Sequence, residues 1–178
     1  MRLRKEKGFS LIELLIVVAI ILIIAAIAVP NLLRSRMAAN ESSAAAGLRT
    51  ITTANITYSS TYNVGYAGTL TALGPKVGAS PTSADADLLD GVLGSTVQPA
   101  VKSGYKFIYL PGPTGATPTT TAPNATFTTF ATPISLGSSG QSGFCVDQTN
   151  VVGKDTTGAV AAPPATACDY TAAGFPPM

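Results

Sequence analysis

Gly8-Phe9-Ser10-Leu11-Ile12-Glu13, with the apolar run Leu14–Val29 that follows it, organises the rest of this 178-residue chain. The run contains sixteen residues without a polar or charged side chain and ends at Pro30. A helix from Leu11 to Val29 would measure about 28 Å, at about 1.5 Å of rise per residue. The hydrocarbon core of a bilayer is about 30 Å thick. The segment is therefore predicted to be a membrane-spanning helix with one charge, Glu13, near its entrance.

The position of the small residue distinguishes this segment from a secretory signal peptide, whose cleavage site follows the apolar core. Here Gly8 precedes the core, at the edge of a basic leader, and Ala25–Ala28 continues directly into further helix. A cut between Gly8 and Phe9 would remove the leader and leave the apolar segment on the mature protein. The new N-terminus would be the amine of Phe9, four residues before Glu13.

In these residues the chain resembles the type IV pilin family, in particular a type IVa-like major pilin; pseudopilins share the same N-terminus. The resemblance rests on Gly8–Glu13, on the apolar run and on Ala28-Val29-Pro30-Asn31-Leu32. It is strong over residues 1 to about 57 and weak beyond. Many pilins carry a glycine eight residues before this proline, where this chain has Leu22. That departure leaves open whether the helix melts before Pro30 in a filament.

The resemblance implies roles for three N-terminal residues. A membrane prepilin peptidase would cleave after Gly8, and the amine of Phe9 would then be methylated. Glu13 would pair with the Phe9 amine of a neighbouring subunit during assembly. In a second interpretation, Glu13 is a carboxylate at the helix end that reaches the membrane interface. A charge at mid-bilayer costs about 2.5–3.5 kcal/mol, and a charge at the interface costs less.

The distribution of charge predicts an orientation in the membrane. Six basic residues flank the span: Arg2, Arg4, Lys5 and Lys7 before it, and Arg34 and Arg36 after it. The larger group lies before the span, so the N-terminus is predicted to be cytoplasmic and the rest extracytoplasmic. From Met37 onward, five basic side chains stand against seven acidic ones, a formal charge of −2. The sequence therefore shows no general surface for nucleic acid or anionic membranes in that part.

The helix is predicted to continue beyond Pro30 to about Ser60. Pro30 lacks an amide hydrogen, and a kink is expected there. Large and small apolar residues then recur at helical spacings: Leu33, Met37, Ala44, Leu48, Ile51, Tyr58 and Tyr62. From Phe9 to Ser60 the helix would measure about 78 Å. Since this is longer than a domain of this size, the apolar first half is expected to protrude.

Segments with β-strand character follow the helix. Tyr105–Leu110, Ala125–Ala131 and Gly143–Asp147 are rich in aromatic and β-branched residues. They predict an antiparallel sheet of three or four strands, packed on the second half of the helix. The fold class is therefore α+β. Between the long helix and the strands, Ser83 is expected to cap a short helix that ends at Gly91. Three acidic residues lie in this short helix: Asp85, Asp87 and Asp90. They are interpreted as capping charges or, alternatively, as a calcium site.

The two cysteines, Cys145 and Cys168, suit a single disulfide, because thiols outside the inner membrane are commonly oxidised. The alternative is two buried free thiols. The stretch after Val152 has few large apolar side chains and cannot bury enough surface to order itself. We expect the bond to hold this tail against the Phe144–Asp147 strand and to cover an open sheet edge.

The sequence offers little catalytic chemistry. The chain has no histidine, which excludes Ser-His and Cys-His nucleophiles and zinc sites built on histidine. No phosphate-binding loop or dinucleotide motif is present. No enzyme activity, metal or cofactor is therefore predicted. Three glycosylation triplets, beginning at Asn40, Asn55 and Asn124, are of a kind that arises by chance, and the Thr-rich stretch at 117–121 is a candidate for O-glycans.

These observations predict three regions: a cleaved leader (1–8), a transmembrane and filament-core helix (9–30) and an extracytoplasmic head (31–178). The predicted function is a structural subunit of a type IV pilus filament, serving adhesion, motility or DNA uptake. The alternatives are a pseudopilin of a type II secretion system and a minor tip pilin that acts as an adhesin or DNA receptor. The expected partners are other copies of the chain, prepilin peptidase and the inner-membrane assembly machinery. The precursor is placed in the bacterial inner membrane and the mature subunit in an extracellular filament.

Overall fold

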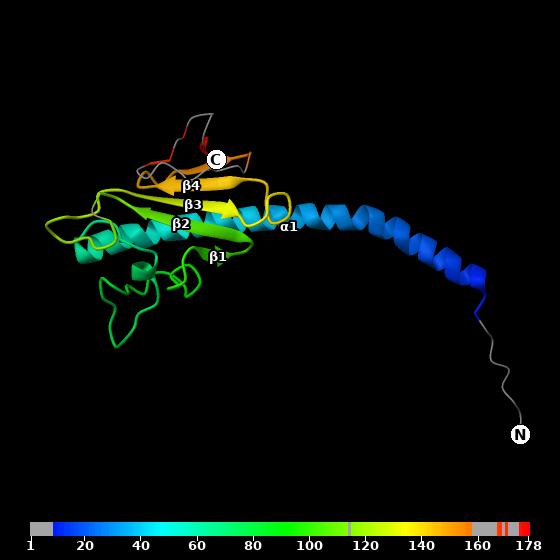
Figure 1. Ribbon diagram of the computed structural model, residues 1–178, viewed down its shortest axis with the longest axis horizontal. Helices are drawn as coiled ribbons and strands as arrows, with labels where there is room; N and C mark the ends of the chain where they lie inside the picture. Colours follow the sequence, from blue (N-terminus) through cyan, green and yellow to red (C-terminus); the bar gives the residue numbers. More distant parts are fainter. Residues whose placement is uncertain (1–8, 114, 158–166, 169, 171–174) are drawn as a thin grey trace, which may run out of the picture. The chain divides into compact units, whose positions relative to one another are not determined.

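The computed structural model describes residues 9–113, 115–157, 167–168, 170 and 175–178. Its first element is α1 (Leu11–Tyr62), a single helix that continues through Pro30 (Figure 1). The predicted continuation beyond the proline is therefore confirmed. The chain divides into two compact units, Met1–Arg36 and Met37–Met178, and α1 contributes to both.

The second unit contains an antiparallel sheet of five strands in the order β1-β2-β3-β4-β5, drawn from green to orange in Figure 1. The strands are β1 (Ala100–Lys102), β2 (Tyr105–Pro111), β3 (Phe127–Pro133), β4 (Gly143–Asp147) and β5 (Val152–Asp155). The α+β class and the three predicted strands are confirmed as β2, β3 and β4. The sheet is larger than the three or four strands expected, because the short strands β1 and β5 extend it on both sides.

The part of α1 beyond Met37 packs on one face of this sheet. Leu48, Ile51 and Tyr58 are fully or almost fully buried and share a core with alternate residues of the strands. The contact is close at Gly47, where a Cβ atom would lie 2.9 Å from Cζ of Phe107. The predicted helical stripe is therefore a core face at these positions, whereas Leu33, in the first unit, is exposed.

Asn55 extends this core with a buried polar group. Its Oδ1 accepts hydrogen bonds from the amide of Ala67 at 3.1 Å and from the hydroxyl of Tyr109 at 3.0 Å, while its Nδ2 donates to the carbonyl of Ile51 at 3.2 Å. A buried amide whose donor and acceptor are both satisfied avoids the desolvation penalty of an orphaned group. It therefore holds the segment after α1 and the middle of β2 in register with the helix.

The short helix predicted after Ser83 is absent from the described residues of that region. A single 3₁₀ turn, Thr71–Leu73, lies earlier in the connection instead. Asp85 accepts hydrogen bonds from the hydroxyl of Thr82 and from the amide of Val77, and Asp90 accepts from the amide of Leu93 at 2.8 Å. Asp and Ser compete for turns through such local bonds, which is why the capping pattern there produces turns and not a helix.

Candidate functional site

The two predicted assembly residues lie on either side of the start of α1: Phe9 is two residues before Leu11, where the helix begins, and Glu13 is within it. Ser10 is the residue before the helix, and its carbonyl accepts the amide of Leu14 at 3.2 Å. Glu13 lies in the first turn, and its Oε2 accepts a hydrogen bond from the amide of Ser10 at 2.9 Å. This bond is one half of a capping box, in which an acid or amide side chain satisfies the first unpaired donor of a helix. Glu13 therefore has a structural role within its own chain as well as the predicted role in assembly.

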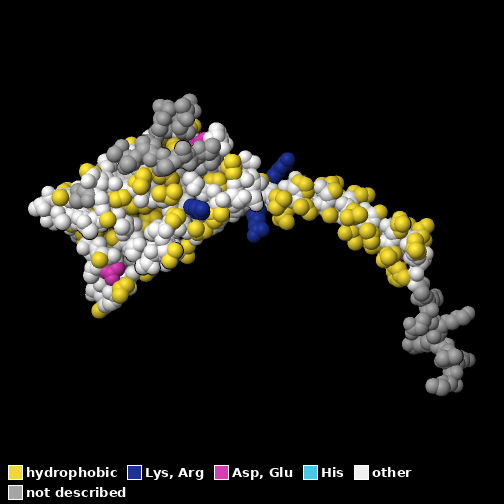
Figure 2. All heavy atoms as spheres, in the orientation of Figure 1, with side chains coloured by type: hydrophobic (Ala, Val, Ile, Leu, Met, Phe, Trp, Pro, Cys, Tyr) yellow, Lys and Arg dark blue, Asp and Glu magenta, His cyan; other side chains and the backbone are white. Residues whose placement is uncertain are grey.

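The large side chains on both sides of Glu13 are apolar and exposed. Phe9 is 81 % exposed and Leu11 80 % exposed, and the large aliphatic side chains between Leu14 and Val29 are also exposed. Figure 2 shows hydrophobic side chains covering the visible face of this part of α1. Among the described residues this is the single helix long and apolar enough to cross a membrane, by length and composition. An uninterrupted apolar surface of this kind requires lipid or another protein around it.

Pro30 lies inside α1, and the polar residues after it form local bonds. The Nδ2 of Asn31 donates to the carbonyl of Ile27 at 3.0 Å, and the hydroxyl of Ser35 donates to the carbonyl of Asn31 at 3.0 Å. Pro30 has no amide hydrogen to donate to the carbonyl of Ala26, so the helix lacks one backbone hydrogen bond there. The kink at Pro30 stays a prediction; the side-chain bonds go to the carbonyls of Ile27 and Asn31 and do not replace the bond to Ala26.

The predicted disulfide is confirmed: Cys145 and Cys168 are joined, with their Cα atoms 5.9 Å apart. Cys145 is in the middle of β4, on the sheet face opposite α1. There it forms a small second core with Phe130, Cys168 and Phe175. The rings of Phe130 and Phe175 lie 5.9 Å apart. The bond therefore attaches part of the C-terminal segment to a sheet face, where the flanking aromatic rings shield it from water.

The location of the disulfide corrects one expectation. The sequence predicts that the bond covers an open edge beside β4, but that edge is paired with β5. The C-terminal residues do cover an edge one strand further out. The amide of Lys154 donates to the carbonyl of Pro176 at 2.9 Å, and the amide of Met178 donates to the carbonyl of Val152 at 3.0 Å. The edge of β5 is therefore protected by main-chain hydrogen bonds.

Asp147 adds a polar contact to this attachment. It is 1 % exposed, and its Oδ2 accepts the amide of Cys168 at 3.1 Å. Its Oδ1 accepts both the amide and the hydroxyl of Thr149, at 2.9 and 2.6 Å. Tyr170 lies beside it, and burial, with the negative charge of Asp147 adding to it, raises the pKa of Tyr170 to about 12.

Removing the disulfide is expected to release the C-terminal segment while α1 stays folded. Closing a loop of this length stabilises a chain by about 3–4 kcal/mol in the chain-entropy model. We expect Cys168→Ser to lower the free energy of unfolding by that amount and to admit proteases beyond Asp155. Limited proteolysis with mass spectrometry would locate the cuts. The double variant Cys145→Ser/Cys168→Ser serves as the control. Because both cysteines act through one bond, the double variant should lose little more stability than the single variant. Free thiols in the wild-type protein under non-reducing conditions would contradict this account.

A polar cluster on α1, which the sequence analysis missed, fixes the loops at one end of the sheet. Glu41 accepts the amides of Gln141 and Ser142 at 2.9 and 3.2 Å and forms an ion pair with Lys154 at 3.1 Å. Burial would raise the pKa of Glu41, but these three partners outweigh it and hold the pKa below its ordinary value of 4.5. Asn40 donates from Nδ2 to the carbonyl of Ser139 at 2.8 Å.

Glu41→Ala is expected to destabilise the protein by about 1.5–3 kcal/mol, because two backbone donors and Lys154 lose a charged acceptor. A lowered pKa means that this stabilisation is present at pH 7 and is lost as the pH falls below 4.5. The difference between wild type and variant should therefore shrink as the pH falls from about 5 to about 3. Denaturant unfolding of the full chain in detergent measures it. Glu41→Gln keeps an acceptor for the two amides and should lose less stability than Glu41→Ala. An equal loss of stability in the two variants would assign the whole effect to the ion pair with Lys154.

The structure also tests the other candidate sites of the sequence. No group of three or more potential metal ligands gathers among the residues described. Asn55 and Asn124 are fully buried, and Asn40 is engaged with Ser139, so none of the three triplets presents a free asparagine. Thr119 and Thr121 of the Thr-rich stretch are exposed. The calcium interpretation of Asp85, Asp87 and Asp90 receives no support, because their oxygens serve turns and two lysines.

Comparison with known proteins converges on the N-terminal segment. Residues 3–29 match the family model for the prokaryotic N-terminal methylation motif. The chain is also 62 % identical, over 39 residues, to the type IV wide pilus major component PilA4 of Thermus thermophilus. That match covers 22 % of this chain and 30 % of the relative, so the chain aligns with less than a third of it. No solved structure matches the chain.

The matched region contains the features built above: the residues on both sides of the predicted cleavage point, the capping acid and the exposed apolar helix. The remainder of the chain supplies a sheet packed on the second part of that helix, which is the layout of a pilin head. The N-terminal methylation motif, the similarity of the N-terminal segment to a major pilus component and the α+β architecture together support a type IV pilin.

Proposed function

We propose that this protein is the structural subunit of a type IV pilus and polymerises through its apolar N-terminal helix. The observation that carries the proposal is the surface of the segment from Phe9 through the first part of α1 to Val29. Its large side chains are apolar and exposed, and it has one acid, Glu13, near its start. In the precursor, lipid would surround this surface. In a filament, the same surface of other subunits would replace the lipid, so that the apolar residues stay out of water in both states.

The partners and the location follow from that exchange of surroundings. The precursor is inserted in the bacterial inner membrane with its basic leader in the cytoplasm. Prepilin peptidase cleaves after Gly8, the amine of Phe9 is methylated, and the inner-membrane machinery adds the subunit to the filament. Glu13 and the Phe9 amine of a neighbour then pair. The finished filament lies outside the cell and serves adhesion, motility or DNA uptake.

Purified surface filaments test the proposal. Filaments sheared from cells should contain this chain as the most abundant protein in mass spectrometry, and its N-terminal peptide should begin at a methylated Phe9. A pseudopilin would be scarce in surface filaments and required for secretion, and a tip pilin would be present in trace amounts. A mature N-terminus after Ala28 would contradict the family-based processing. Filaments that lack the chain would contradict the structural role.

A further inference from the structure

Two arginines without a carboxylate partner follow the exposed apolar surface of α1. The structure describes seven basic side chains, and three lysines among them form ion pairs: Lys76, Lys102 and Lys154. The other four have no ion pair within the described part of the chain: Arg34, Arg36, Arg49 and Lys106. Arg34 and Arg36 belong to the same compact unit as the apolar surface and come directly after its last exposed leucine, Leu33.

Arg34 and Arg36 lie on opposite sides of the helix. An α-helix has about 3.6 residues per turn, so two residues of chain rotate a side chain by about 200° around the axis. Both side chains are exposed, and Figure 2 shows basic side chains on two sides of α1 where its hydrophobic surface ends. A partner that covers one side of the helix can reach one of the two guanidinium groups. A layer that surrounds the helix can reach both.

The lipid headgroup region is such a layer, and it is within reach of both side chains. Arg34 and Arg36 follow Val29, the end of the apolar run, by about 7.5 and 10.5 Å of helix. The headgroup region adds about 5–7.5 Å to each side of the hydrocarbon core. The Cα–Cβ bonds of a helix tilt toward its N-terminus, so both long side chains lean back toward the apolar segment. A tilted span would bring them closer still.

The neighbouring polar groups do not supply a negative charge to these arginines. The side chains of Asn31 and Ser35 donate to the carbonyls of Ile27 and Asn31, at 3.0 Å each. Glu41, the next acid along the chain, accepts the amides of Gln141 and Ser142 and pairs with Lys154. Both guanidinium groups therefore keep their donors for a group from outside the described chain.

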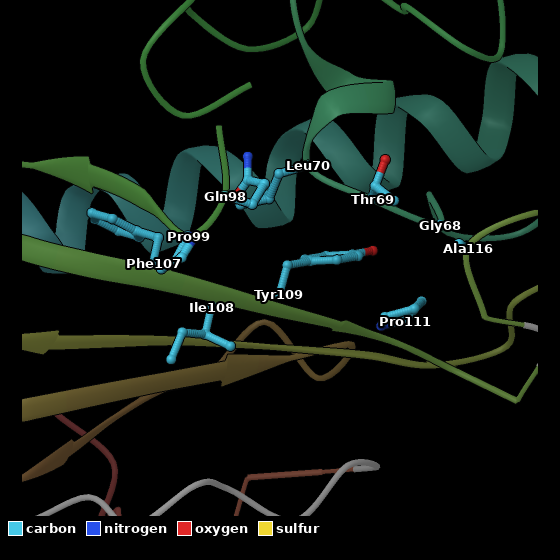
Figure 3. Close-up of a pocket in the computed structure, with 10 residues that line it drawn as sticks. All are labelled: Gly68, Thr69, Leu70, Gln98, Pro99, Phe107, Ile108, Tyr109, Pro111 and Ala116. Atoms are coloured by element: carbon cyan, nitrogen blue, oxygen red, sulfur yellow. The ribbon is translucent and has the colours of Figure 1, made fainter. Parts of the chain in front are cut away.

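The second unit offers no equivalent pair among its described residues. Its apolar cavity of about 540 Å³ beside β2 has uncharged walls, including Phe107, Tyr109 and Pro111 (Figure 3). An anionic group there would lose its hydration without gaining a cationic partner. Arg49 is on α1 and Lys106 is on β2; both are exposed, and neither follows an exposed apolar helix surface.

We propose that Arg34 and Arg36 each bind the phosphate of a separate anionic phospholipid, on opposite sides of α1, in the leaflet around the C-terminal end of the span. A guanidinium group donates paired hydrogen bonds to phosphate oxygens. A lipid with a net negative charge is preferred to a zwitterionic one, whose own cation offsets the phosphate. These contacts hold the subunit at one depth in the membrane. The inference rests on the membrane step of the proposed function and does not depend on polymerisation.

The test measures the lipids on each side of the helix separately. The chain has no tryptophan, so one introduced tryptophan is a single fluorescent reporter. Ile27 and Val29 are exposed and lie about two turns before Arg34 and Arg36, each on the same side as its arginine. The mature chain from Phe9 onward, with Ile27→Trp or Val29→Trp, is reconstituted in vesicles of phosphatidylcholine and phosphatidylglycerol at equal mole fractions. One lipid or the other carries bromine on its acyl chains, which quenches a nearby tryptophan.

We expect phosphatidylglycerol to be preferred over phosphatidylcholine by at least about threefold at both reporters, and added sodium chloride to weaken the preference. Arg34→Gln should lower the preference below about 1.5-fold at the Ile27→Trp reporter and leave the Val29→Trp reporter unchanged. Arg36→Gln should do the opposite. Arg49→Gln is the matched control, because it removes the same charge from the second unit, and it should change neither reporter.

Equal quenching by the two lipids, equal losses at both reporters, or a loss of the preference in Arg49→Gln would overturn the proposal. If the Arg34 and Arg36 variants instead reduced energy transfer between labelled copies and left the lipid preference unchanged, the two side chains would bind a second copy of the chain, which also overturns it. Alkaline extraction of the vesicles measures insertion independently. Protein that is extracted would contradict the membrane step of the proposed function as well, whereas inserted protein without a lipid preference would contradict this inference alone.

Discussion

Gly8→Leu should abolish maturation, so that the chain accumulates in the membrane with its leader attached and no filaments form. The residue before the proposed cleavage point is small, and a leucine would not fit where glycine does. Without cleavage, Phe9 keeps a neutral peptide N–H in place of an ammonium, so Glu13 has no charged partner. The four basic residues of the leader would also have to enter an apolar filament core, where each charge costs about 2.5–3.5 kcal/mol on insertion scales.

Intact-mass measurement of membrane and filament fractions checks this result. Wild-type protein should appear without residues 1–8 and with one added methyl group; the variant should keep residues 1–8 and lack the methyl group. Gly8→Ala is the matched control, because alanine adds a single methyl group and should still be processed. Normal cleavage of Gly8→Leu would contradict the role assigned to this glycine.

Glu13→Gln should leave insertion intact and remove most filaments. The substitution separates the two roles of this side chain. A glutamine oxygen can still accept the amide of Ser10, as Glu13 does at 2.9 Å, so the helix keeps its cap. Only the charge is lost. The Phe9 ammonium of an incoming subunit would then be buried without a counter-ion, and removing one member of a buried pair typically costs about 3–5 kcal/mol.

Counts of surface filaments, with membrane fractionation as the measure of insertion, test this prediction. Glu13→Asp is an informative control: it keeps the charge on a shorter side chain, and it should retain more filaments than glutamine does. If Glu13→Gln cells carried normal numbers of filaments, Glu13 would be a helix cap alone. A loss of inserted protein would instead assign the defect to helix formation.

Much of the fold and of the assembly segment was predictable from local patterns. An unbroken apolar run has one favourable environment. Alternating aromatic residues mark β2, and short runs that contain aromatic and β-branched residues mark β3 and β4. Two strands had weaker signals. β1 has three residues and β5 has four, too short to show a period. The Ser103-Gly104 turn, where both residues have positive φ, was a hairpin signal that would have indicated β1.

The sequence by itself determined the long helix, its apolar first half, the processing motif, the central strands and the pairing of the two cysteines, because each depends on neighbouring residues or on a single possible partner. Tertiary structure decided which face of the sheet carries the disulfide, how the C-terminal residues cover β5 and which residues of β2 pair with β1. It also joined Glu41 to Gln141, which are 100 residues apart. Such contacts depend on how the strands pack on α1, and that packing is set by the whole core at once, so no local pattern encodes them.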